Sequence, residues 1–432
     1  MIWANADGRG PMDRRMWRYF WQRPRTHREV IAERRVSFLE LFYDLIYVVL
    51  IARIASGLHG EITWDAVATF GVLFGLLWVG WFNGTLLHDA HGRPDVRNRL
   101  MTFLQMFAIA VMAVFAPTAD AAGGAGFAAA YTIFLVILVG QWITVARTER
   151  DDPFNGPIAR GYTTMMAVMT AWTAASVFVP ARVRVWMWGA FVVVFILGMV
   201  AIALGRGPSG SRTRREADPM ATESLLERYA LFVIIVLGEV VASVVAGLGA
   251  VHELTPAVFA TGFAGLAVGI AFWWTYFDMI AMRPPAASTR ARYLYTLLQL
   301  PLTLAITGVG AATVSLIEHT DAPDPATSWA FAGFVVLAML SMIATSRLLR
   351  DWTRLGAMFR PATTAGLGVA ALAVALAAVG VPAIVLTGGL FVTMCAQWAW
   401  AVRGWLATPE GIEHVAAAPV EDAAGPGQRA AS

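Results

Sequence analysis

Long apolar stretches alternate with short polar ones along most of the chain. Twelve of these stretches are long enough to cross a hydrocarbon core of about 30 Å as helices. A backbone in lipid must satisfy its own hydrogen bonds, and a helix does so within one segment. The pattern predicts an all-α, polytopic membrane helix bundle with about twelve transmembrane helices. Their approximate spans are 38–58, 64–86, 99–116, 124–147, 160–180, 183–204, 226–248, 256–278, 292–315, 328–348, 362–380 and 382–402.

Composition supports this prediction and excludes several classes of function. Of the 432 residues, 58% are hydrophobic and 14% are charged, and the mean hydropathy is +0.62, outside the range of soluble domains. All 32 basic residues are arginines, so no lysine can form a Schiff base with retinal or pyridoxal phosphate. The one cysteine, Cys395, excludes a disulfide within the chain and a cysteine-ligated metal cluster.

The arginines between the apolar stretches predict the orientation of the chain. They gather before the first stretch and in every second loop, whereas the alternate loops are short or acidic, apart from Arg182 and Arg184. Because arginine-rich loops stay in the cytoplasm, we expect both termini to be cytoplasmic and the protein to lie in the cell (plasma or inner) membrane. The arginines then serve topology beside the lipid bilayer, and we expect no nucleic-acid partner.

Glycine-rich and charged stretches divide the chain into five parts. Residues 1–36 form a cytoplasmic, arginine-rich tail, and residues 37–204 form a first unit of six helices. Residues 205–222 form a cytoplasmic linker, because glycine, serine and arginine dominate them. A second six-helix unit covers 223–405, and we expect the tail 406–432 to be disordered.

The second unit repeats features of the first at a nearly constant distance along the chain. The offset is 187 residues in the first helix, 194 in the third and 200 further on. Because each unit has an even number of crossings, we expect two parallel six-helix repeats related by an axis along the membrane normal. Sites in such proteins lie between the repeats, which points to the first and seventh helices. The matches include Glu40 with Glu227, Gln105 with Gln299, and Arg147-x-x-Arg150-Asp151 with Arg347-x-x-Arg350-Asp351.

The first helix carries charges that are costly at membrane depth. Glu40 and Asp44 share one helical face, whereas Arg53 points the opposite way. Glu239 lies near the middle of the seventh helix, and the repeat places Arg53 at a similar depth. We therefore expect an Arg53–Glu239 ion pair across the two halves. The pair is either a structural link between the halves, or it releases a carboxylate that binds a proton or cation when the pair breaks.

Polar groups at the ends of the second and eighth helices form the other candidates. Asn83 and Asp278 follow aromatic clusters, and we expect their partners to be Gln105 and Gln299 of the third and ninth helices. A hydrogen-bonded core explains them as well as a permeation pathway does. The candidate substrate or ion pathway therefore comprises Glu40, Asp44, Arg53, Asn83, Gln105, Glu239, Asp278 and Gln299.

Signals for enzymatic chemistry are weak. His88-Asp-Ala-His91 has the residue types of metal ligands but no third ligand at a fixed spacing, so we expect no metal. No phosphate-binding loop, nucleotide fingerprint or serine–histidine pair is evident. We expect no cofactor and no enzymatic activity.

Three motifs resemble a known family. Glu40-Leu-Phe-Tyr-Asp-Leu-Ile-Tyr-Val, the stretch from Arg228 to Glu239, and Phe272-Trp-Trp-Thr-Tyr-Phe-Asp278 are similar to hallmarks of the bacterial low temperature requirement A (LtrA) family. The resemblance covers about 36–400 and implies a multi-pass membrane protein of undefined biochemical activity, named for a cold-growth phenotype. It implies that the hallmark acidic residues are Glu40, Asp44, Glu239 and Asp278. The chain departs from the pattern at Arg53 and Ser56, where a glutamine and a histidine are expected.

Two functions follow from these observations. The first is a transporter or channel-like protein for an unidentified small solute or ion, in which Glu239 is reachable by water. The second is a non-transporting membrane factor for low-temperature or membrane-stress adaptation, in which Glu239 is sealed. A membrane enzyme would need clustered catalytic groups that the sequence does not offer.

Overall fold

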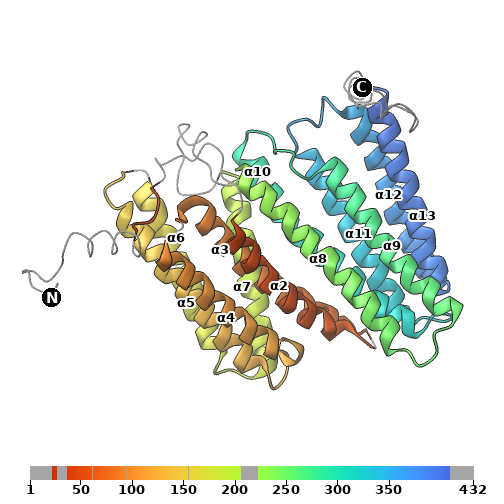
Figure 1. Cartoon of the computed structure of the whole chain (residues 1–432), viewed down its shortest axis with the longest axis horizontal. Coiled ribbons are helices and arrows are strands. Elements are labelled where there is room, and N and C mark those ends of the chain that lie inside the picture. Colours follow the sequence, from red (N-terminus) through yellow and green to blue (C-terminus); the bar gives the residue numbers. More distant parts are fainter. Residues whose placement is uncertain are drawn as a thin grey trace, which may run out of the picture.

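The computed structural model describes residues 22–26, 37–60, 62–93, 95–153, 155–205 and 222–408. These ranges contain twelve long α-helices and two short 3₁₀-helices and no strand, so the predicted all-α bundle is confirmed (Figure 1). Most of the predicted tail 1–36, the linker 206–221 and the tail beyond 408 lie outside the described residues. The helices are α2 (Phe38–Ala55), α3 (Trp64–His91), α4 (Val96–Phe115), α5 (Gly124–Thr148), α6 (Asn155–Ser176), α7 (Ala181–Ala203), α8 (Glu223–Ala250), α9 (Pro256–Met279), α10 (Thr289–Glu318), α11 (Pro325–Arg347), α12 (Gly356–Val379) and α13 (Ala383–Leu406), with η1 (Ser56–Leu58) and η2 (Ala116–Thr118).

Short polar side chains define where the helices of the site begin. Ser37 caps α2 in a capping box, in which its hydroxyl accepts from the Glu40 amide and the Glu40 carboxylate accepts from the Ser37 amide. Thr63 caps α3, and Thr222 caps α8 by accepting from the Leu225 amide. Each cap satisfies an amide that the first turn leaves without an intrahelical partner.

Ten of the twelve helices are long and apolar enough to cross a membrane. The exceptions are α2, which carries Glu40, Asp44 and Arg53, and α6, which is rich in threonine and includes Arg160. Both run along neighbouring spans, because α2 packs against α4 and α8, and α6 packs against α5. The chain is a polytopic helix bundle, and crossing by α2 and α6 stays a prediction.

Corresponding helices have corresponding neighbours in the two halves. In the first half α2 packs on α4, α4 on α5, α5 on α6 and α3 on α7. In the second half α8 packs on α10, α10 on α11, α11 on α12 and α9 on α13. The parallel repeat itself stays a prediction, because α10 packs across the halves against α7, whereas α4 turns Phe107, Val111 and Val114 outward.

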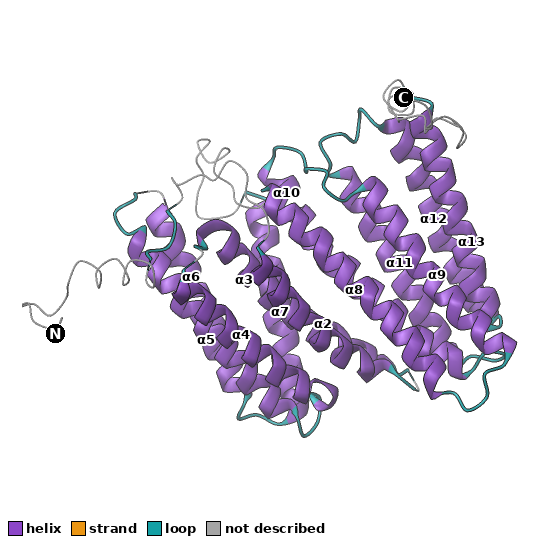
Figure 2. Cartoon of the chain, in the orientation of Figure 1, coloured by secondary structure: helices purple, strands orange, loops and turns teal. Residues whose placement is uncertain are grey.

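The two halves meet where α2 lies beside α8. In Figure 1, α2 runs through the middle of the molecule next to α8, and the two helices are in contact along their lengths. The connections gather at the two ends of the bundle (Figure 2). The exposed stripe of α2 consists of Phe38, Phe42, Leu45, Val49 and Arg53, at helical spacing. Its acidic face is therefore turned inward, toward α8.

Candidate functional site: a buried ion pair between the two halves

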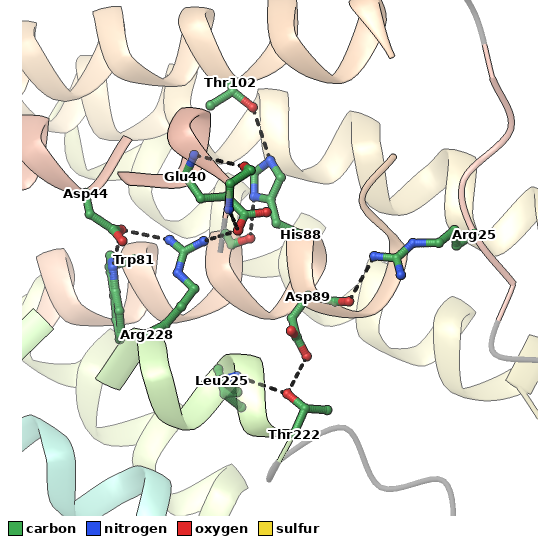
Figure 3. A network of polar contacts seen from close by, with 12 residues as sticks. Arg25, Glu40, Asp44, Trp81, His88, Asp89, Thr102, Thr222, Leu225 and Arg228 are labelled. Carbon is green, nitrogen blue, oxygen red and sulfur yellow. Dashed lines mark hydrogen bonds and ion pairs between the residues drawn. The ribbon is translucent and has the colours of Figure 1, made fainter. Parts of the chain in front are cut away.

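The polar centre of the α2–α8 interface is an ion pair between Asp44 and Arg228. Arg228 Nη2 donates to Asp44 Oδ1 over 2.7 Å (Figure 3). The two residues are 2% and 0% exposed, so water does not screen their attraction. Trp81 of α3 donates its indole N–H to the same Asp44 oxygen over 2.9 Å. One carboxylate oxygen thus joins α2, α3 and α8.

Both partners of this pair keep polar atoms without a hydrogen-bond partner. These buried atoms are Asp44 Oδ2, Arg228 Nε and Arg228 Nη1. Leaving such an atom unsatisfied costs about 1–3 kcal/mol, and a native protein that does so has a reason, such as a water molecule or an ion. The site can therefore donate to a ligand from Arg228 and accept from it at Asp44.

Glu40 lies one turn before Asp44 on the same face of α2. Its Oε2 is 3.6 Å from Arg228 Nη1, while the same carboxylate oxygen accepts from the Ser37 amide at the start of the helix. Arg228 therefore faces two carboxylates of α2. The sequence prediction that Glu40 and Asp44 share one helical face agrees with this geometry.

Aromatic side chains surround the ion pair on its other sides. Tyr43 and Tyr47 of α2 are hydrogen-bonded through their hydroxyls, which are 3.1 Å apart, and both are fully buried. Trp81 stacks on Phe232 of α8 with ring centroids 4.2 Å apart. A methyl group added at Gly84 would lie 2.7 Å from the Tyr43 hydroxyl, so glycine allows the close approach of α3 to α2. The ion pair therefore lies among buried aromatic side chains.

The predicted Arg53–Glu239 pair is wrong. Arg53 is exposed and lies in the last turn of α2, where an arginine can extend its guanidinium to the membrane surface and complement the helix dipole. Glu239 is buried on α8 and accepts from the Ser243 hydroxyl over 2.9 Å. The prediction placed the two at one depth from the repeat, but the rotation of α2 turns them to different sides.

The predicted partners of the four other candidates are also wrong. Asn83 accepts from the Tyr162 hydroxyl of α6 and donates to the Val79 carbonyl over 2.7 Å, while Gln105 donates to Gln141 of α5 over 2.8 Å. Tyr162 and Gln141 lie on helices that sequence spacing does not indicate. In the second half, Gln299 accepts from the Tyr276 hydroxyl over 3.3 Å, and the exposed Asp278 accepts from the Trp398 indole over 2.7 Å.

The C-terminal end of α3 carries a second polar cluster, next to the ion pair (Figure 3). His88 contacts the Gly84 carbonyl and the Thr102 hydroxyl of α4, at 2.7 and 3.1 Å. Thr222, the cap of α8, donates to the Asp89 carboxylate over 2.7 Å, and Arg25 donates to the Asp89 carbonyl over 3.2 Å. The histidine motif thus links α3 to α4 and lies beside a bond that joins the two halves.

The chain also matches known proteins. A sequence model of the family described as "Bacterial low temperature requirement A protein (LtrA)" matches residues 35–407. The chain belongs to the LtrA family. An uncharacterized protein of Rhizobium meliloti (strain 1021) is 28% identical over 301 residues, which cover 66% of this chain and 70% of that relative. Its title gives no activity.

Three of the acidic positions that the LtrA resemblance implies face the same helix interface. Glu40 and Asp44 contact Arg228, and Glu239 lies on the same face of α8 as Arg228, eleven residues or about three turns further along. Asp278 is the exception, since it is exposed at the end of α9. The LtrA hallmarks of the first and seventh helices are therefore parts of one interface.

Sequence reasoning missed Arg228 and Trp81. Arg228 stands in the second turn of α8, and by sequence it stood out only as the first residue of an LtrA-like motif. The repeat contained the signal that could have found it, because the offset of 187 residues maps Arg228 onto Leu41, between Glu40 and Asp44. Trp81 gave no such signal, because an aromatic belt explained its cluster equally well.

Proposed function

We propose that this LtrA-family protein is a transporter or channel-like protein for a small solute or ion, and that the α2–α8 interface is its binding site. The observation that supports this most is the Asp44–Arg228 pair with its open hydrogen-bonding atoms. Ionisable groups inside a membrane are costly and mark substrate or ion pathways. A pair that serves only as a link would gain from saturating those atoms.

The chemistry of the open atoms defines what the site can hold. Arg228 offers a donor at Nε, while its Nη1 faces Glu40 Oε2 at 3.6 Å, and Asp44 offers an acceptor at Oδ2. A ligand that bonds both Arg228 and Asp44 needs an acceptor for the arginine and a donor for the carboxylate. A water molecule has both, and so does a small polar solute. Binding at either atom weakens the 2.7 Å pair between the halves. Occupancy of the site is thereby linked to contact between α2 and α8.

The proposal includes the arrangement of the chain in the membrane. The protein lies in the inner membrane with both termini cytoplasmic, and its two halves are parallel repeats. Matching neighbours within each half support the repeat. The proposal assigns the chain no enzymatic reaction, and its partners are the lipid bilayer and the transported solute or ion.

A second function is a non-transporting membrane factor for low-temperature or membrane-stress adaptation. The observation that favours it is the complete burial of Arg228, which is 0% exposed and joins both halves. An ion pair of this kind can fix how two units pack.

Flux into proteoliposomes separates the two functions. Vesicles that hold a pH-sensitive dye and the purified protein are given a pH gradient, and small polar solutes and monovalent ions are added one at a time. We expect at least one to change the internal pH faster than in protein-free vesicles. Asp44→Asn should abolish that flux, because it keeps the shape and removes the charge. Asp65→Asn, an exposed carboxylate at the start of α3, is the matched control and should behave as wild type.

Wild-type vesicles that match protein-free vesicles for the whole panel would contradict the transporter. Equal flux in wild type and Asp44→Asn would remove the ion pair from the pathway. The membrane factor predicts that wild-type vesicles match protein-free vesicles and that Asp44→Asn has a lower unfolding temperature than wild type.

A further inference from the structure

A second ionisable group lies on the same face of α8 as Arg228, about three turns further along the helix. Glu239 is about 24 Å from the start of α8 and about 16 Å from its end at 1.5 Å per residue. It is 3% exposed, its Oε1 accepts from the Ser243 hydroxyl, and its Oε2 has no hydrogen-bond partner although it is buried. Glu239 therefore has a single neutral hydrogen bond, from its own helix.

No positive charge compensates this carboxyl group among the described residues. The helices that pack on α8 are α2, α3, α9 and α10. No charged or titratable side chain from these helices acts on Glu239, and α2 turns Arg53 outward. Beside Glu239, α9 and α10 approach Val240 through Gly269 and Gly310. The turn of α8 that contains Val240, next to Glu239, thus packs against glycines of α9 and α10.

We propose that Glu239 is a proton-binding site and carries its proton in this conformation. An ionised carboxylate without a cation is strongly unfavourable in an apolar setting, so the group takes up a proton instead. A proton needs no coordination shell and no cavity, whereas a metal ion needs several oxygen ligands, and the described residues contain no group of three or more acidic, histidine or cysteine side chains that could hold one. In the protonated form the carboxyl group stays in the bilayer core as a neutral acid.

An aromatic contact separates this site from the Asp44–Arg228 pair. Phe232 lies one turn after Arg228 on the face of α8 that leads to Glu239. It stacks on Trp81, and both side chains are buried. Trp81 also donates to Asp44. A change in the ion pair would therefore shift the Trp81 ring that stacks on Phe232. The contact keeps the two ionisable sites apart while the pair is intact.

The role of this site in transport rests on the proposed function, but its protonation does not. With transport, Glu239 supplies the coupling ion: a proton enters when the carboxyl group faces one side and leaves when it meets water on the other. The solute then moves together with a proton, or in exchange for one. Without transport, the protonated acid remains as a property of the folded chain.

Infrared spectroscopy tests the protonation directly. Wild type and Glu239→Gln are reconstituted in lipid at neutral pH, and their difference spectrum is recorded. We expect the carbonyl stretching band of a protonated carboxylic acid in wild type only. Glu223→Gln, at the exposed start of the same helix, should instead remove ionised carboxylate bands. Ser243→Ala should keep the acid band but shift it to higher frequency, because that carboxyl group loses its hydrogen bond.

Chemical labelling gives a second measurement that needs no variant. Dicyclohexylcarbodiimide reacts with protonated carboxyl groups in apolar surroundings, and mass spectrometry of peptides locates the product. We expect labelling of Glu239 and none of Glu223. Labelling should fall as the pH rises far enough to ionise the group.

Two outcomes would overturn the assignment. Ionised carboxylate bands for Glu239 at neutral pH are one, and labelling of Glu223 without Glu239 is the other. A protonated Glu239 in a protein that shows no flux would retain the site and remove the proposed transport. Flux in a protein whose Glu239 is ionised would retain the proposed transport and remove the proton site. Failure of the proton site and failure of the proposed transport therefore give different results.

Discussion

Removing Arg228 should destabilise the protein more than removing Arg53, the other arginine of α2 and α8. Asp44 is 2% exposed, and among the described residues its ion-pair partner is Arg228, at 2.7 Å. Arg228→Met would leave that carboxylate buried without a cation and deprive Glu40 of its Arg228 contact at 3.6 Å. Breaking a buried pair in this way costs about 3–5 kcal/mol. We expect a loss of that size in the free energy of unfolding.

A double-mutant cycle isolates the pair from the rest of the interface. Asp44→Asn keeps an oxygen that can accept from Trp81, so in the double variant with Arg228→Met no charge is stranded at position 44. The double variant should therefore be more stable than Arg228→Met alone. The interaction energy should fall near the upper end of the range of about 0.5–3 kcal/mol that contacting residues show.

Unfolding by SDS in mixed micelles, followed by circular dichroism, gives these free energies. Arg53→Met is the matched control, since Arg53 is exposed on α2, and surface substitutions usually change stability by no more than about 0.5 kcal/mol. An interaction energy near zero would refute the reasoning. So would an Arg228→Met variant as stable as Arg53→Met.

Three further results follow from the contacts of the interface. Gly84→Ala should lose about 1–3 kcal/mol, because its methyl group meets the buried Tyr43 hydroxyl at 2.7 Å, whereas Gly71→Ala on the same helix has nothing within 4 Å and should be neutral or stabilising; equal unfolding curves would contradict this. Thr222→Ala should lose about 0.5–1.5 kcal/mol more than Thr255→Ala, because both remove a helix cap but only Thr222 also bonds Asp89; equal losses would contradict a link between the halves there. Reporters fused to the two termini should both read cytoplasmic, and opposite readings would remove the even number of crossings.

The helices were predictable because the apolar stretches encode them. Each predicted span coincides with a helix to within a few residues, and Glu40 and Asp44 share a face because a four-residue spacing returns to the same side. The caps at Ser37, Thr63 and Thr222 add local signals. Local periodicity determines these features, and no distant residue is needed.

The partners were not predictable, because they depend on how each helix is rotated about its axis. Arg53 and Glu239 have suitable charges, but α2 turns Arg53 to its exposed stripe. Asn83 pairs with Tyr162, a residue that belongs to a different helix from the one expected. A salt bridge forms within about 4 Å, and sequence spacing does not give the rotation of two helices to that accuracy. The offset of 187 residues maps Arg228 onto Leu41, between Glu40 and Asp44, but it does not give the rotation of either helix.

The central claim is that charge inside the α2–α8 interface, and not charge elsewhere on α2, serves transport. The most direct test compares Asp44→Asn with Arg53→Met in the vesicle flux assay, using protein that circular dichroism shows to be folded at the assay temperature. Asp44 lies inside against Arg228, and Arg53 lies outside on the same helix. The account predicts that flux is lost in Asp44→Asn and unchanged in Arg53→Met. Loss in Arg53→Met with full flux in Asp44→Asn would contradict it.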